Sequence, residues 1–132
     1  EGFQRGLIAA LRGRNVPEAG VDAALYTGHW VRAHRLEAQL LLRHRREELV
    51  GAEWPEDVRA RAETVGVELQ TAVREYARRR YGRVSDANLR RIWFAVMDVP
   101  YGALKRYAHA GREVPAQIEE MIRASATAVL SG

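Results

Sequence analysis

Apolar residues recur at intervals of three and four along most of the chain, and single glycines and prolines divide the pattern into stretches. This spacing is the period of the α-helix, and no stretch shows the strict alternation that is typical of a strand. The 132 residues, of which 47% are hydrophobic, suffice for one domain with a buried core. We therefore expect an all-α protein, with residues 1–132 folded as a single bundle of five to six helices.

The first part of the chain predicts a short helix followed by a central one. Residues 3–11 have helical spacing, and this helix must end before Pro17. The stretch 17–50 is too long for one globular helix, so we expect it to break near His34 or Arg35. Its first half carries apolar residues on more than one side, which indicates a helix buried among several neighbours.

The clearest helical pattern begins after Trp54. Pro55 suits a first helical turn, and Glu56 and Asp57 place negative charge at the positive end of the helix dipole. At the other end Arg78–Arg80 complement the negative pole, and Gly82 can adopt the left-handed conformation that ends a helix. The apolar stripe of this helix consists of Val58, Ala62, Val65, Leu69, Ala72, Val73 and Tyr76.

The last third of the chain predicts two more helical stretches. Ser85 or Asp86 is suited to cap the first of them. Pro100 lies within its pattern and predicts a kink or a break, because proline lacks a backbone donor and disfavours helical geometry in the preceding residue. The final helix is expected to begin at Pro115 and to run to about residue 130.

The sequence contains few patterns that are typical of catalytic or metal sites. The chain has no cysteine, and His29 and His34 are five residues apart, which points them about 140° apart on a helix. Gly-rich phosphate loops are missing, and the adjacent pairs Glu47-Glu48 and Glu119-Glu120 diverge by about 100° on a helix beside arginines, which favours surface salt bridges over catalysis. We therefore expect no enzymatic activity, no metal and no cofactor.

No segment of the sequence predicts a membrane span. The longest uninterrupted apolar run, Ile92–Met97, is much shorter than the roughly 18 residues that a spanning helix needs. We expect a protein without membrane contact, located in the cytoplasm.

Several aromatic residues share the predicted helices with groups that can form hydrogen bonds. They are either ordinary core or the lining of a pocket between helices, with Tyr26 and His29 orienting a small apolar or aromatic molecule. The predicted ligand-binding residues are Tyr26, His29, Trp30, Trp93, Phe94, Met97 and Tyr101.

The final helix has a narrow apolar band that ends in small residues. Such a band packs either inside the chain or against a second copy, and the second arrangement gives a two-fold interface of four helices. The predicted dimer-interface residues are Leu89, Ile118, Met121, Ile122, Ser125 and Val129.

The charge pattern supports an alternative function. The net charge is +4, and all but one of the 21 basic residues are arginine. A helical interaction module could bind acidic partners or nucleic acid through arginine clusters. These clusters are Arg43, Arg45 and Arg46, and Arg78 to Arg80.

Several segments resemble the regulatory half of TetR-family transcriptional repressors. Glu1-Gly2-Phe3, followed by Leu7, is similar to the turn that leads from the DNA-binding domain into the connecting helix of that family. The likeness also rests on Arg45-Arg46-Glu47-Glu48-Leu49, Trp54-Pro55, Arg59 to Ala62, and Asp98-Val99-Pro100-Tyr101-Gly102-Ala103 followed by Gly111 and Pro115.

The resemblance implies a function for the whole chain. It implies a homodimer held by the last two long helices and a small effector that enters the helical core. Residues 1–12 correspond to a helix that connects this core to an N-terminal helix-turn-helix domain, which is absent from this chain and through which alone DNA is bound. The effector is expected to act on that helix through Phe3, Leu7 and Leu11.

Overall fold

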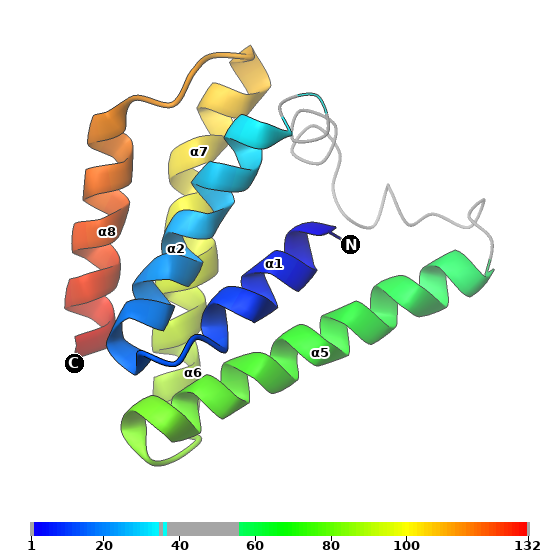
Figure 1. Ribbon diagram of the computed structural model, residues 1–132, viewed down its shortest axis with the longest axis vertical. Coiled ribbons are helices and arrows are strands. Elements are labelled where there is room, and N and C mark those ends of the chain that lie inside the picture. Colours follow the sequence, from blue (N-terminus) through cyan, green and yellow to red (C-terminus); the bar gives the residue numbers. More distant parts are fainter. Residues whose placement is uncertain (1, 35, 37–55, 132) are drawn as a thin grey trace.

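The computed structural model describes residues 2–34, 36 and 56–131, with side chains described from residue 66 in the last range. Within these ranges every regular element is a helix and there is no strand (Figure 1). Because α6, η1 and α7 follow one another directly, the described residues form five helical rods. The elements are α1 (Gly2–Leu11), α2 (Val16–Ala33), α5 (Glu56–Tyr81), α6 (Asp86–Trp93), the π-helical η1 (Phe94–Asp98), α7 (Val99–Ala110) and α8 (Ala116–Ser131). The predicted all-α bundle is confirmed.

The helix ends follow the local signals in the sequence. Asn15 caps α2 by accepting a hydrogen bond from the Glu18 amide at 3.3 Å. Ser85 caps α6 in the same way, as predicted. Gly82 and Gly111, which follow α5 and α7, have φ values of 78° and 64°, in the left-handed region that glycine adopts without strain. The helix α2 ends at Ala33, so the predicted break near His34 is confirmed.

Of the kink or break that Pro100 predicts, the break does not occur. Asp98 and Val99 keep helical backbone angles, and the chain continues from α6 through η1 into α7. The Val99 amide donates to the Phe94 carbonyl, five residues back, which is the bond of a π-turn. This wider turn lies directly before the proline that lacks a donor, so the irregularity is a change of hydrogen-bond pattern within a continuous rod.

The helix α2 is the centre of the bundle (Figure 1). It contacts α1, α5, η1, α7 and α8. The helices α7 and α8 run in opposite directions, joined by the loop at the top of Figure 1. The predicted central position of this helix is therefore confirmed.

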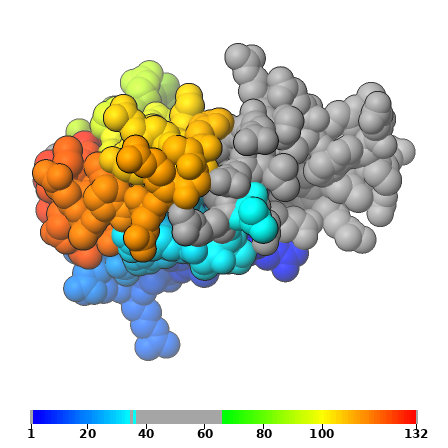
Figure 2. Space-filling view, turned by 90° about the horizontal axis from the view of Figure 1, so that it is seen from above, coloured from blue at the N-terminus to red at the C-terminus, as the bar shows by residue number. Residues whose placement is uncertain are grey.

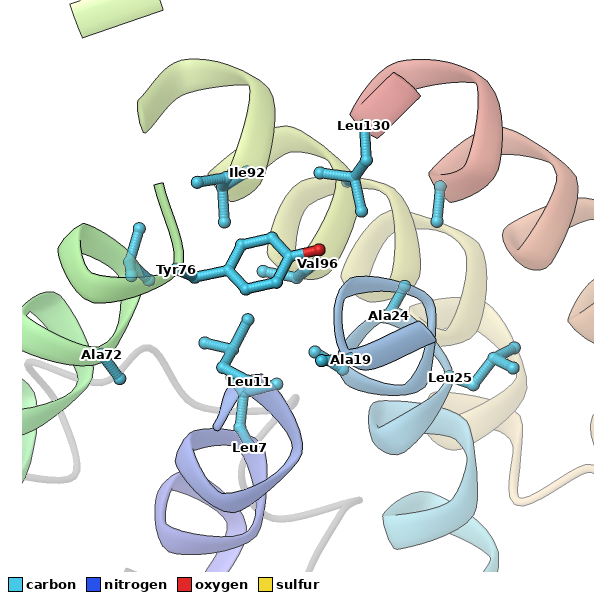
Figure 3. Close-up of a cluster of buried hydrophobic side chains, with 14 of the residues drawn as sticks. Leu7, Leu11, Ala19, Ala24, Leu25, Ala72, Tyr76, Ile92, Val96 and Leu130 are labelled. Atoms are coloured by element: carbon cyan, nitrogen blue, oxygen red, sulfur yellow. The ribbon is translucent and has the colours of Figure 1, made fainter. Parts of the chain in front are cut away.

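The side chain of Tyr76 lies in the middle of the core (Figure 3). It is fully buried, and its hydroxyl donates to the Val16 carbonyl at 2.7 Å and accepts from Arg80 Nη1 at 3.1 Å. Burial raises the pKa of the Tyr76 hydroxyl above its ordinary value, and the neighbouring Arg80 offsets part of this rise. The residues buried around it in Figure 3 include Leu7, Leu11, Ala19, Ala24, Ile92, Val96 and Leu130.

Residues at the end of α5 hold the ends of two other helices. Arg79 donates to the carbonyls of Leu11 and Gly13, at the end of α1. The Leu130 carbonyl near the end of α8 accepts from Arg80 Nε at 3.0 Å and from the Tyr81 hydroxyl at 2.7 Å. These donors satisfy carbonyls that have no partner within their own helix.

The close approach of α2 to α5 and α8 at Gly20 provides the first prediction. A Cβ at Gly20 would lie 2.6 Å from Leu130 Cδ1 and closer still to the Tyr76 hydroxyl. We expect Gly20→Ala to lower the free energy of unfolding by about 1–3 kcal/mol, because the core must shift to admit the methyl group. Urea unfolding followed by circular dichroism measures this change.

Gly28→Ala is the matched control on the same helix. A Cβ there meets Leu104 Cδ1 at 3.8 Å, an ordinary contact. The control should be neutral or stabilising by up to about 1 kcal/mol, because alanine favours the helix. Equal losses in the two variants would contradict the close approach at Gly20.

The second prediction concerns the Tyr76 hydroxyl. Its pKa is raised above the value of 10.0 that an exposed tyrosine has, so the unfolded chain loses this proton first as the pH rises. The stability that this group contributes is present below about pH 10 and is lost progressively above it. Tyr76→Phe should lower the free energy of unfolding by about 1–3 kcal/mol at pH 7, because two hydrogen-bond partners are left unpaired. As the pH rises from about 10 to 11, the free energy of unfolding should fall less in this variant than in the wild type, because phenylalanine has no proton to lose. Urea unfolding across this pH range tests both effects, and parallel pH profiles would be the contrary result.

Candidate functional site

An aromatic cluster joins the beginning of α1 to the second half of α2. Tyr26, Trp30 and His34 are spaced by four residues along α2 and therefore lie on one side of it. Phe3 of α1 lies against the first two, with ring centroids 5.6 Å from Tyr26 and 5.4 Å from Trp30. His34 stacks on Trp30 at 4.8 Å. We call Phe3, Tyr26, Trp30 and His34 the α1–α2 aromatic cluster.

The cluster is closely packed against the backbone of α1. The Tyr26 hydroxyl donates to the Gly2 carbonyl at 3.3 Å, and a Cβ on Gly6 would overlap the Tyr26 ring. Burial raises the pKa of the Tyr26 hydroxyl. Trp30 is only 9% exposed and packs with Val31 and the half-buried Phe3. The position of α1 is thus tied directly to these rings.

His29 lies near a different helix from Tyr26. Its Nε2 atom is 3.9 Å from Glu119 Oε1 of α8, and Arg32, one turn further along α2, forms an ion pair with the same carboxylate. Arg32 also donates to the Val114 carbonyl at 3.3 Å. Tyr26 thus contacts α1 while His29 lies near α8, and that the two residues orient one ligand stays a prediction.

The other predicted ligand residues lie on the rod formed by α6, η1 and α7. Trp93 and Met97 are half-buried against the main core, whereas Phe94 and Tyr101 are each 47% exposed. The structure thus divides the seven predicted residues between two parts of the bundle. That all seven surround one ligand stays a prediction, since helical spacing does not say which neighbouring helix covers each side of a helix.

Large exposed apolar side chains occur on the rod of α6, η1 and α7 and on α8. Five such residues occur in the described part of the chain, and Phe94, Tyr101 and Met121 belong to η1, α7 and α8. A shallow hollow between α6 and α8 adds half-buried Trp93 and Val129. We call the following set the apolar face: Leu89, Trp93, Phe94, Tyr101, Ile118, Met121 and Val129.

The predicted dimer-interface residues fall mostly on this face, with one correction. Met121 is 59% exposed, and Ile118 and Val129 are half-buried. Ile122, in contrast, is 2% exposed and packs into the core of its own chain with Leu130. Assigning Ile122 to an interface is therefore wrong. The remaining predicted residues, Leu89 and Ser125, are half-buried.

A small cavity lies where the ends of α2 and α7 meet the loop before α8. Its volume is about 120 Å³, and it is lined by none of the seven predicted ligand residues. Sequence reasoning missed it because its buried residues, such as Val31 and Ala108, have the pattern of ordinary core. Its lining is Val31, Arg32, Tyr107, Ala108, Gly111, Arg112, Glu113 and Val114.

The described side chains include no group of three or more His, Asp or Glu residues arranged to hold a metal ion. None of the helices that the structure describes combines the length and the apolar character needed to cross a bilayer.

Comparison with known proteins found no matching family model, no matching curated protein and no matching solved structure. The relation to TetR-family repressors therefore remains a resemblance of sequence motifs. Any functional proposal must rest on the surfaces and contacts of this chain.

Proposed function

We propose that this chain is the effector-sensing and homodimerisation domain of a bacterial transcriptional repressor that resembles the TetR family. The observation that carries the proposal is the concentration of exposed apolar side chains on the rod of α6, η1 and α7 and on α8. Exposed apolar surface gathered in one region is typical of a protein interface. A repressor of this kind would act in the cytoplasm.

The apolar face suits a second copy of the same chain. Two neighbouring antiparallel helices from each copy form a four-helix interface when they are related by a two-fold axis. Around the hollow with Phe94, the charged residues Asp86, Arg90 and Asp98 include both signs. In a two-fold dimer the same patch of each copy faces the other, so the acidic residues of one copy can lie opposite the basic residues of its partner.

The α1–α2 aromatic cluster supports the sensing part of the proposal. Phe3 lies on α1, which corresponds to the connecting helix in the resemblance, and it packs directly on Tyr26 and Trp30 of α2. A small apolar or aromatic molecule that enters beside these rings must displace Phe3 and shift α1. In a repressor this shift changes DNA binding by the N-terminal domain, with a coupling of about 1–3 kcal/mol.

The alternative, a module that binds acidic partners through arginines, has less support. Arg79 and Arg80 donate to backbone carbonyls at the ends of α1 and α8, so they already have structural roles. Arg78 is exposed. The other predicted cluster, Arg43, Arg45 and Arg46, lies outside the described residues.

The oligomeric state tests the dimer. We expect light scattering to give about twice the chain mass of 14.9 kDa, and Met121→Arg to raise the dimer dissociation constant at least about tenfold, because a charge becomes buried without a partner. Val67→Arg is the matched control, since Val67 is 61% exposed on α5, away from the apolar face. A monomeric wild type, or equal effects of the two substitutions, would remove the dimer from the proposal.

A ligand screen tests sensing. Among small apolar and aromatic compounds, at least one should raise Tm by about 5 °C when present at ten times its Kd. The shift should be lost in Tyr26→Ala and retained in Tyr101→Ala, because Tyr101 lies on the apolar face and not in the cluster. The sensing role fails if no compound shifts Tm or if the shift survives in Tyr26→Ala.

A further inference from the structure

The cavity at the end of the bundle has an apolar floor. Val31 of α2, Ala108 of α7 and Val114 of the following loop are 6%, 4% and 5% exposed, and all three line it. Figure 2 looks onto this end, where the cyan end of α2 lies beside the yellow and orange residues of α7 and the loop. The floor is thus formed by buried residues from α2, from α7 and from the loop before α8.

Charged side chains line the same cavity. Arg32 is held in place by its ion pair with Glu119 and its hydrogen bond to the Val114 carbonyl. Arg112 is exposed, and its guanidinium forms no ion pair with any residue that the structure describes. Its backbone is fixed, because the Arg112 amide donates to the Tyr107 carbonyl at 2.9 Å. Two arginine residues therefore line the cavity together with its apolar floor.

We propose that this cavity binds a short branched monocarboxylate. The alkyl group would occupy the floor, and the carboxylate would accept hydrogen bonds from Arg112 and Arg32 at the rim, where charge-assisted bonds to arginine are strong. The volume of about 120 Å³ is slightly below that of a cavity that holds benzene, so the ligand has about six non-hydrogen atoms, as isobutyrate does.

The acidic side chain at the rim narrows the choice of ligand. Glu113 lines the cavity next to Arg112 in the sequence, and its negative charge opposes a second carboxylate on the ligand. A dicarboxylate such as succinate should therefore bind less well than isobutyrate. Glu113→Gln should tighten isobutyrate binding modestly.

The cavity lies apart from the proposed dimer interface, and it adjoins the aromatic cluster only through its floor, since Val31 and Ala108 pack with Trp30. None of the residues that line the cavity belongs to the apolar face, and neither Phe3 nor Tyr26 lines it. Binding of isobutyrate and the oligomeric state can therefore be measured separately on the same protein, and either can fail alone.

Titration of the full chain with isobutyrate, followed by amide chemical shifts in NMR spectra, tests the site. We expect saturable shifts at Val31, Ala108 and Arg112 with a millimolar Kd. The neutral isobutyramide should bind at least about tenfold more weakly, and Arg112→Gln should weaken isobutyrate binding about tenfold, because each removes the charged contact. Arg106→Gln is the control, an exposed arginine of α7 that does not line the cavity, and it should leave Kd unchanged.

The proposal is overturned if shifts at these amides do not saturate by about 50 mM isobutyrate, well above a millimolar Kd. It is also overturned if isobutyramide binds as well as isobutyrate, or if Arg112→Gln and Arg106→Gln have the same effect. Arg112 is exposed, so its substitution should leave the fold intact, and circular dichroism verifies this.

Discussion

The approach of α2 to the buried Tyr76 is the contact on which the rest of the bundle depends. Gly20 has no side chain, so the Tyr76 ring of α5 and Leu130 of α8 reach the surface of α2 at one point. The Tyr76 hydroxyl donates to the Val16 carbonyl, which satisfies the one polar atom of a fully buried ring. Three helices that are distant in sequence are thereby fixed against one another, and α1 and α6 pack around them (Figure 3).

The central position of α2 also separates the surfaces to which function is assigned. Tyr26 and Trp30 of α2 meet α1 through Phe3, whereas His29 and Arg32 meet α8 through Glu119. A molecule bound at either of these contacts would therefore touch the same helix. Since α8 also carries part of the apolar face, α2 provides a direct physical connection between α1 and the proposed dimer interface.

Much of the fold was predictable because its signals are local. The caps at Ser85 and Gly82 depend on a few neighbouring residues, and both act as the sequence predicts. Pro100 shows the limit of local reasoning, because a π-turn in the preceding residues keeps the rod continuous. The candidate site was less predictable. Helical spacing placed Ile122 in the same band as Met121, but packing buries Ile122 and leaves Met121 exposed.

The helical character of the chain, and where most of the described helices begin and end, can be read from the residues alone. These properties follow from periodicity, capping and backbone preferences within a few residues. Three-dimensional packing was needed to show which helix covers each side of α2, that Arg79 and Arg80 hold the ends of other helices, and that Val31, Ala108 and Val114 line a cavity. The reason is that each of these features joins residues far apart in the chain, and such contacts depend on the packing of whole helices.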